Sequence, residues 1–124
     1  MKLQVKVKEM SFDELVNAIE TSTYGSDWLS IHCPSEYKEM YDNSEYRCHS
    51  ETLAEILLAG GKIELEDHEQ EKTMEVDLNR MLKQMGVYIK KYPQYLNDIQ
   101  NEDDDYYTWN NYIQVVMYGE IIYG

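Results

Sequence analysis

The sequence predicts an α+β fold, a single small domain with a short, mostly antiparallel sheet and roughly four helices. Its 124 residues suit one hydrophobic core, and 43% of them are hydrophobic although the formal net charge is -13. Segments with the two-residue repeat of strands are mixed with segments of helical period, and two of the strands form a hairpin-like pair. That order favours α+β over a doubly wound parallel sheet. No linker or internal repeat divides residues 1–124.

The chain begins with an alternating segment and a capped helix. Residues Lys2–Lys8 alternate basic or polar side chains with apolar ones, which predicts a half-buried edge strand. Ser11 and Glu14 have the spacing of a capping box, and an apolar stripe follows, so we expect a helix that ends near Glu20. Trp28–Cys33 alternates again and predicts a second strand, which the next residue, a proline, ends.

The middle of the chain is less regular. Residues 35–48 are polar and rich in tyrosine, and we expect one helical turn around residues 37–41 and a short strand near Tyr46. Ser50 is expected to cap the next helix, and the Gly60–Gly61 pair is expected to end it.

The following segment predicts a hairpin and a long helix. Residues 62–76 alternate on both sides of a charged turn, Asp67–Lys72, which is the pattern of a β-hairpin. Asp77 is expected to cap a helix that runs through Lys91, and Pro93 is expected to begin a separate turn.

A last helix is expected after the acidic residues 101–105. Trp109 and Tyr112 lie on its apolar stripe and are predicted core residues, and Gly119 is expected to end it. The tail, residues 120–124, is apolar enough to pack as a short strand or an extended segment.

Charge and composition limit the location and the partners. The chain has no run of about 18 apolar residues, as a transmembrane helix requires. Its N-terminus lacks the apolar stretch of a signal peptide, so we expect a cytoplasmic protein. Two cysteines, Cys33 and Cys48, are too few for a disulfide scaffold. Nucleic acid and anionic membranes both bind positive surfaces, so the charge argues against them and favours a basic protein surface as partner.

Two mirrored pairs, His32-Cys33 and Cys48-His49, contain potential zinc ligands. Zinc sites separate the ligands of a pair by about two to four residues, whereas adjacent residues on a strand point to opposite faces. At most one residue of each pair would then reach a shared ion. We therefore favour small buried cysteines with surface histidines, and a Cys/His metal-binding domain is the alternative.

Motifs of catalysis are missing from the sequence. It contains no phosphate loop, no dinucleotide fingerprint and no serine nucleophile elbow. A Cys–His dyad drawn from the mirrored pairs would lack a local nucleophile motif and a third residue. We predict a protein that is not an enzyme and needs no cofactor.

The candidate partner-binding residues are carboxylates in two segments, one around the hairpin turn and one before the last helix. They are Glu64, Glu66, Asp67, Glu69, Glu71, Glu102, Asp103, Asp104 and Asp105. The second segment lacks the alternating pattern and the distal glutamate of a calcium loop. Alternatively, the first segment is only the solvated side of the hairpin, and the second stabilises the start of the last helix.

Some tyrosines are further candidates for exposed binding residues, because tyrosine buries area and keeps a polar tip. They are Tyr37, Tyr41, Tyr46, Tyr106 and Tyr107.

Two segments resemble small acidic accessory proteins carried by phages and conjugative elements of Gram-positive bacteria. Residues 54–67 have a helix pattern, a glycine stop and a short strand, and residues 113–124 have a helix pattern that ends in Gly119-Glu120-Ile121-Ile122-Tyr123-Gly124. These motifs are structural, so the resemblance carries over no functional residue. It implies a mobile-element context, in which small acidic proteins include inhibitors of host defence that imitate the charge of nucleic acid and occupy basic grooves of nucleases.

Three functions are compatible with these features. The first is a non-enzymatic acidic binding protein of a mobile element, which occupies a basic surface of a host nucleic-acid-handling protein. The second is an acidic structural domain or homo-oligomer joined through tyrosine-rich surface, with the charge serving solubility. The third, which the ligand spacing disfavours, is the Cys/His metal-binding domain.

Overall fold

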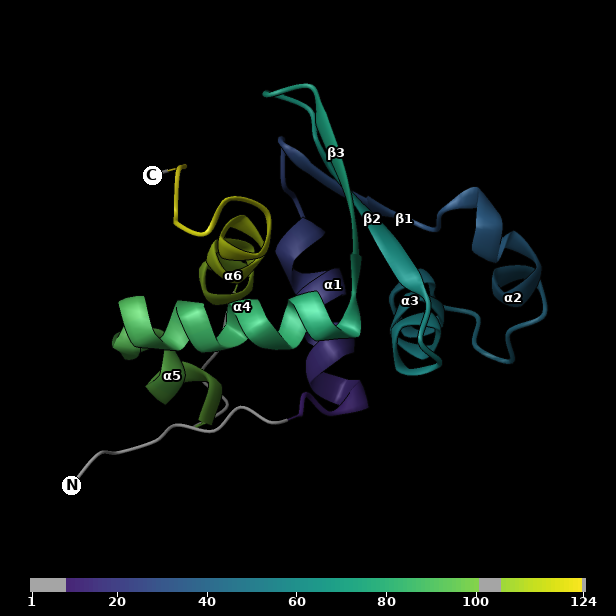
Figure 1. Ribbon diagram of the computed structural model, residues 1–124, viewed down its shortest axis with the longest axis horizontal. Helices are drawn as coiled ribbons and strands as arrows, with labels where there is room; N and C mark the ends of the chain where they lie inside the picture. Colours follow the sequence, from purple (N-terminus) through teal and green to yellow (C-terminus); the bar gives the residue numbers. More distant parts are fainter. Residues whose placement is uncertain (1–8, 101–105, 124) are drawn as a thin grey trace.

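The computed structural model describes residues 9–100 and 106–123, which form six α-helices and a three-stranded antiparallel sheet (Figure 1). The fold class is the predicted α+β, with more helices than the sequence indicated. The helices are α1 (Phe12–Thr23), α2 (Lys38–Asp42), α3 (His49–Leu58), α4 (Leu78–Lys91), α5 (Pro93–Gln100) and α6 (Tyr106–Tyr118). The strands are β1 (Leu29–His32), β2 (Lys62–Asp67) and β3 (Lys72–Asp77), and a 3-10 turn, η1 (Ser35–Tyr37), precedes α2. The predicted strand at Lys2–Lys8 lies outside the described residues.

Helix α1 begins with the predicted capping box. The Ser11 hydroxyl accepts a hydrogen bond from the Glu14 backbone N–H at 3.1 Å, and the Glu14 carboxylate accepts one from the Ser11 N–H at 3.0 Å. The helix continues past the predicted end at Glu20. In its last turn the Thr23 hydroxyl donates to the Ile19 carbonyl at 2.9 Å, which satisfies this polar side chain.

Helix α3 ends at the predicted glycine pair. Gly60 has a φ of 93°, in the left-handed region that glycine adopts without steric cost. Gly61 is buried against the helix, and a Cβ at this position would lie 2.6 Å from Cγ2 of Ile56. The pair therefore supplies both the turn and the close approach of β2 to α3.

The prediction that Ser50 caps α3 is wrong. Cys48 is the N-cap residue, and its side chain makes no capping bond. Ser50 is buried in the first turn, and its hydroxyl lies 3.5 Å from the Glu20 carboxylate of α1. The Ser50 side chain therefore contacts another helix and does not cap its own. Local sequence patterns do not reveal such a contact.

The segment between β1 and α3 contains the predicted helical turn but not the predicted strand. Residues 35–42 form η1 and α2, whereas Tyr46 has irregular backbone. The Tyr46 ring stacks on Phe12 with centroids 5.1 Å apart, and its backbone N–H donates to the Ser44 hydroxyl at 3.1 Å. This segment is therefore stabilised by ring stacking and a local turn, and not by the hydrogen bonds of a strand.

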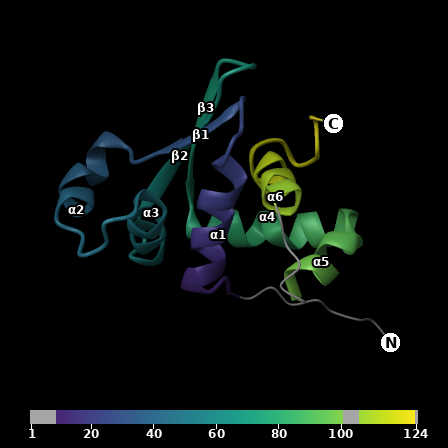
Figure 2. The same ribbon diagram turned by 180° about the vertical axis from the view of Figure 1, so that it is seen from behind.

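The sheet has the order β1-β2-β3, with β2 and β3 forming the predicted hairpin. Ile63 lies opposite Val76, and β1 pairs antiparallel with β2 so that Ile31 lies opposite Leu65. These four side chains are buried on the inner face. Helices α1 and α3 contact β1 and β2 on this side, and α4 continues from the end of β3 (Figures 1 and 2).

Helix α6 is central to the core and packs beside α1 and α4 (Figure 2). Trp109 and Tyr112 are buried, as predicted. The Tyr112 hydroxyl donates to the Met81 carbonyl of α4 at 2.6 Å, and the Tyr88 hydroxyl of α4 donates to the Thr108 carbonyl at 2.6 Å. The buried hydroxyls therefore join the two helices through hydrogen bonds in both directions.

The C-terminal tail packs without forming a strand. Gly119 ends α6 with a φ of 77°. Beyond it, the Gln114 side-chain carbonyl accepts hydrogen bonds from the backbone N–H groups of Ile122 at 2.9 Å and Tyr123 at 2.7 Å. A side chain of α6 thus supplies the partners that a neighbouring strand would otherwise provide.

Helix α5 stands where the sequence predicted a separate turn at Pro93. Proline fits the first turn of a helix, because the N–H that it lacks would have no partner in the helix. Among the described helices, none is long and apolar enough to cross a membrane.

Candidate functional site

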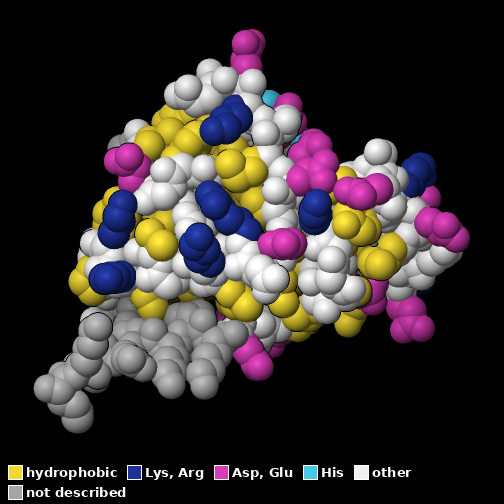
Figure 3. All heavy atoms as spheres, in the orientation of Figure 1, with side chains coloured by type: hydrophobic (Ala, Val, Ile, Leu, Met, Phe, Trp, Pro, Cys, Tyr) yellow, Lys and Arg dark blue, Asp and Glu magenta, His cyan; other side chains and the backbone are white. Residues whose placement is uncertain are grey.

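The outer face of the sheet is acidic. Glu64 and Glu66 on β2 and Glu75 on β3 alternate with buried positions, so their side chains point away from the core. We call these three residues the acidic sheet face. Figure 3 shows acidic side chains along the sheet and at the hairpin tip, with Lys and Arg side chains over α4.

Within the acidic sheet face, Glu66 is paired and Glu64 faces another acid. One Glu66 oxygen lies 2.8 Å from Nε2 of His32, and the other lies 3.7 Å from Nδ1 of His68. Glu64 lies directly opposite Glu75 in the register of β2 and β3. Like charges directly opposite each other are destabilising, by up to roughly 1 kcal/mol. A cation bound over this pair would remove the repulsion.

The hairpin tip extends this acidic surface. Glu69 and Glu71 are exposed, and Glu71 has a φ of 51°, which is unfavourable for a residue with a Cβ. The tight turn therefore projects both carboxylates into solvent. The second predicted segment lies outside the described residues and comprises Glu102, Asp103, Asp104 and Asp105.

Asp67 does not belong to the exposed acids, contrary to the prediction. It is 0% exposed and accepts hydrogen bonds from the hydroxyls of Tyr118 at 2.5 Å and Tyr123 at 2.6 Å, and from the N–H groups of Glu69 at 2.9 Å and Gln70 at 3.1 Å. Burial raises the pKa of its carboxyl, but these donors outweigh burial and leave the pKa below its usual value. Asp67 therefore acts as an internal anchor between the hairpin turn and the C-terminal segment.

The same contact acts on the tyrosines. Burial, followed by the hydrogen bond to Asp67, raises the pKa of Tyr123 to about 12 and raises that of Tyr118 as well. Both hydroxyls stay protonated and remain donors at neutral pH.

The two histidines of the mirrored pairs do not converge. His32 points to the outer face of the sheet, where it meets Glu66. His49 is bonded through both ring nitrogens, with Nε2 donating to the Ile31 carbonyl at 2.7 Å and Nδ1 lying 2.7 Å from the Tyr41 hydroxyl. Because its ring bridges α2 and β1, His49 has a structural role.

Contrary to the prediction, neither cysteine is fully buried, since Cys33 is half-buried and Cys48 is exposed. Both are held in the thiol form. Burial, and then the charge of Asp42, raise the pKa of Cys33, while a hydrogen bond with Glu51 and the charges of Glu51 and Glu20 raise the pKa of Cys48. Since the thiolate is both the nucleophile and the metal ligand, these surroundings disfavour either use. Among the residues that the structure describes, no group of three or more His, Cys, Asp or Glu is arranged to hold a metal ion.

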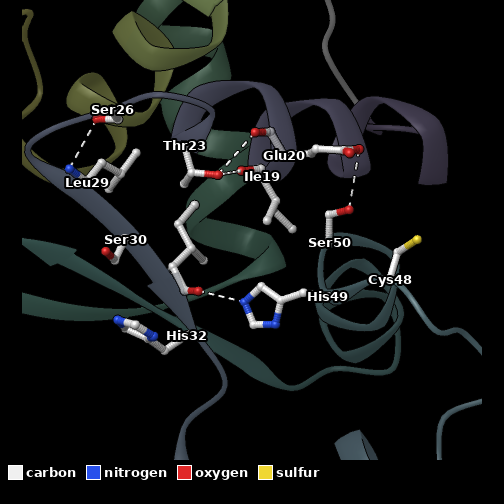
Figure 4. A pocket seen from close by; sticks show the side chains of 11 residues that line it. Ile19, Glu20, Thr23, Ser26, Leu29, Ser30, His32, Cys48, His49 and Ser50 are labelled. Carbon is white, nitrogen blue, oxygen red and sulfur yellow. Dashed lines mark hydrogen bonds between the residues drawn. The ribbon is translucent and has the colours of Figure 1, made fainter.

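A groove of about 660 Å³ runs beside β1, on the edge that does not pair with β2 (Figure 4). Its walls include Ile19 and Glu20 of α1 and Ser50 of α3. Figure 4 shows the His49 ring reaching from α3 to the Ile31 carbonyl on β1. Sequence patterns do not reveal this groove, because they identify strands but not the strand edge that stays open.

Helix α4 carries four Lys or Arg and no Asp or Glu. The Arg80 guanidinium donates to the Val116 carbonyl at 2.8 and 3.1 Å, and the Lys91 ammonium donates to the Gly119 carbonyl at 2.9 Å. Cations near the C-terminus of a helix stabilise its last carbonyls and its dipole. Two of the four cations of α4 therefore stabilise the end of α6.

The acidic sheet face with the hairpin tip and the groove beside β1 are both open for binding in the described part of the chain. No protein-family model, curated protein or solved structure matches the chain.

Proposed function

We propose that the protein is a non-enzymatic, cytoplasmic binding protein whose acidic sheet face and hairpin tip dock on a basic surface of a protein partner. The observation that carries the proposal is the opposed pair Glu64 and Glu75 on the solvent side of a sheet, in a chain of net charge -13. In the unbound protein, the repulsion between these two carboxylates lowers the stability of the sheet, and a cationic partner removes this repulsion.

A nucleic-acid-handling protein of a host cell is the partner class that the acidic surface and the mobile-element resemblance favour together. Proteins that bind nucleic acid have positive grooves, and a negative surface is attracted to them over long range. Such electrostatic attraction speeds association and weakens as salt rises. In this role the protein inhibits its partner by occupying the partner's positive groove.

The test uses two variants with the same change of charge. Glu64→Lys with Glu75→Lys alters the acidic sheet face, whereas Glu36→Lys with Glu39→Lys alters exposed acids of η1 and α2. The immobilised wild type is expected to retain basic nucleic-acid-binding proteins from lysate at low salt and to release them at high salt.

The sheet-face variant is expected to lose this retention, the control variant is expected to keep it, and the purified partner is expected to lose activity when wild type is added. Equal retention by both variants, or retention that is indifferent to salt, would contradict the proposal.

A homo-oligomer joined through aromatic surface is the second candidate. Tyr107 is 68% exposed beside a cavity of about 490 Å³ that Trp28, Tyr95, Tyr106 and Tyr123 also line. Light scattering distinguishes the two functions. A defined oligomer that Tyr107→Ser dissociates would favour this candidate, whereas a monomer at working concentration would exclude it.

A further inference from the structure

We propose that the groove beside β1 binds an extended segment of a partner protein as an added strand, parallel to β1, and that a Lys or Arg side chain of this segment lies against Glu20. Addition of a strand to an open sheet edge is a recurring mode of peptide recognition, in which backbone hydrogen bonds supply affinity and alternate side chains supply specificity. The groove meets the acidic sheet face at His32, which lines the groove and pairs with Glu66, but the inference does not depend on the function proposed for that face.

The backbone groups that face the groove follow from the pairing of β1 with β2. The His68 N–H donates to the Trp28 carbonyl at 2.8 Å, which places Trp28 in the ladder toward β2. In an antiparallel pair, alternate residues direct both N–H and C=O to the same side. Leu29 and Ile31 therefore direct their N–H and C=O groups away from β2, toward the groove.

Side chains already occupy two of these four edge groups. The Ser26 hydroxyl lies 3.2 Å from the Leu29 nitrogen and accepts its N–H, and His49 donates to the Ile31 carbonyl at 2.7 Å (Figure 4). Tyr41 holds the His49 ring from its other nitrogen. Within the described residues, the Leu29 C=O and the Ile31 N–H are the two edge groups that no side chain caps.

These two open groups match a parallel strand. In a parallel pair, one residue of the added strand donates its N–H to a carbonyl of β1 and accepts a hydrogen bond from the N–H that lies two residues further along β1. The Leu29 C=O and the Ile31 N–H, which flank Ser30, are such a pair. An antiparallel neighbour needs both groups of one residue, so at Leu29 or at Ile31 it would meet one group that is already bonded. The hydrogen bonds of the Ser26 and His49 side chains with the edge therefore select the direction of the added strand and protect the edge against indiscriminate pairing.

The charge of the groove selects a cationic segment. Glu20 lines the groove beside Ser50, and the lining residues that the structure describes include no Lys or Arg. Glu51 follows Ser50 in the first turn of α3 and adds negative charge near Cys48, which also lines the groove. In an added strand, the side chains next to the residue opposite Ser30 point to the inner side of the sheet, where the groove lies. One of these side chains is the Lys or Arg that we assign to Glu20.

The probe is the capped hexapeptide acetyl-Thr-Val-Thr-Lys-Val-Thr-amide, titrated into ¹⁵N-labelled protein and followed by NMR. The third residue is designed to lie opposite Ser30. The Ile31 amide signal is expected to shift on binding, whereas the Leu29 amide, which already donates to Ser26, is expected to move little. No shift of the Ile31 amide in peptide at millimolar excess would overturn the proposal.

Two methylated peptides provide a matched control. N-methylation of the third residue removes the N–H that reaches the Leu29 carbonyl and is expected to weaken binding by roughly two- to tenfold, the range for one hydrogen bond. N-methylation of the fourth residue, whose N–H points away from β1, is expected to preserve binding. Equal affinities of the two methylated peptides would overturn the strand geometry.

Spin labels on the peptide test the direction. A label at the N-terminus is expected to broaden the amide signals of Ser26 and Leu29, and a label at the C-terminus those of His49 and Ser50. The reverse pattern would overturn the parallel arrangement. Shifts of the Ile31 amide that grow with protein concentration in the absence of peptide would assign the edge to a second copy of the chain and overturn the partner proposal.

Glu20→Gln tests the charge, with Glu36→Gln as the exposed control. The Glu20 variant is expected to bind the lysine peptide roughly two- to fivefold more weakly, the range for a partly exposed ion pair. Its affinity for the same peptide with glutamine in place of lysine is expected to match that of the wild type. Equal weakening for both peptides would overturn the assignment of Glu20 to a cation.

Discussion

The two faces of the β2–β3 hairpin hold carboxylates in opposite ways. On the inner face, Asp67 is buried and accepts hydrogen bonds from two tyrosine hydroxyls and two backbone amides. On the outer face, Glu64 and Glu75 face each other across the strands. Directed donors stabilise the inner charge, whereas the outer pair is mutually repulsive. The position of an acid relative to the pleat therefore determines whether it stabilises the fold or remains available to a partner.

The largest expected effect is that of Asp67→Ala. The substitution leaves the two tyrosine hydroxyls and two amides without their acceptor, and we expect it to lower the free energy of unfolding by roughly 3 kcal/mol. Urea denaturation followed by circular dichroism measures the loss. Glu66→Ala, one position away on the outer face, is the control and is expected to cost less than about 1 kcal/mol. Similar losses for both variants would contradict the distinction between the faces.

Asp67→Asn sharpens the comparison through pH. The folded protein holds the pKa of Asp67 below its ordinary value of 3.8, so the charged carboxylate stabilises the fold. This contribution is fully present above pH 3.8 and is lost as the pH falls through the lower folded-state pKa. Urea denaturation at a series of pH values measures the free energy of unfolding of both proteins. At neutral pH the wild type is expected to have the larger value, and the difference between the two proteins is expected to narrow in acid. A gap of constant size would indicate that the charge of Asp67 is unimportant.

Tyr123→Phe removes one of the four donors and keeps the ring that packs on Trp28. We expect a loss of about 1 kcal/mol, the net value of one hydrogen bond. Thermal denaturation measures it. Tyr24→Phe, on a side chain that is 82% exposed, is the control and is expected to be neutral. A neutral Tyr123→Phe would show that the other three donors suffice.

The smallest effect is a gain. Glu75→Gln relieves the repulsion with Glu64, and we expect it to stabilise the protein by a few tenths of a kcal/mol, roughly the lower end for cross-strand pairs. The gain is expected to disappear at high salt, because the pair is open to solvent. A double-mutant cycle with Glu64→Gln isolates the pair from other charges. A destabilising Glu75→Gln, or a coupling that salt does not change, would refute the repulsion.

Features that depend on a few neighbouring residues were predictable from sequence. The capping box of Ser11 and Glu14, the hairpin at 62–76 and the glycine stop of α3 each follow from short spacings, and the structure confirms them. The same holds for Asp77, whose carboxylate accepts the Arg80 N–H at 2.8 Å as the cap of α4. Local hydrogen bonds and side-chain alternation determine these elements.

Features that depend on distant partners were not predictable in the same way. Asp67 looked like part of a charged turn, and its anchoring role depends on Tyr118 and Tyr123, which lie 51 and 56 positions away. One local signal was present, since Asp67 continues the every-second-residue pattern of the buried Ile63 and Leu65 and so lies on the same face of β2. The groove beside β1 carries no comparable signal, because Ser26, His49 and Glu20 come from separate elements.

The contact between Asp67 and Tyr123 also constrains the order of events in folding. A hairpin forms from neighbouring residues, whereas closing a loop of 56 positions requires the chain to bring distant segments together at an entropic cost. The hairpin that forms first can already make the local bonds from the Glu69 and Gln70 amides to Oδ1 of Asp67, whereas Oδ2 gains its two tyrosine donors only when α6 and the tail arrive. Pulsed hydrogen exchange would then record protection of the Glu69 and Gln70 amides together with the ladder of β2 and β3, and before protection of the α6 amides.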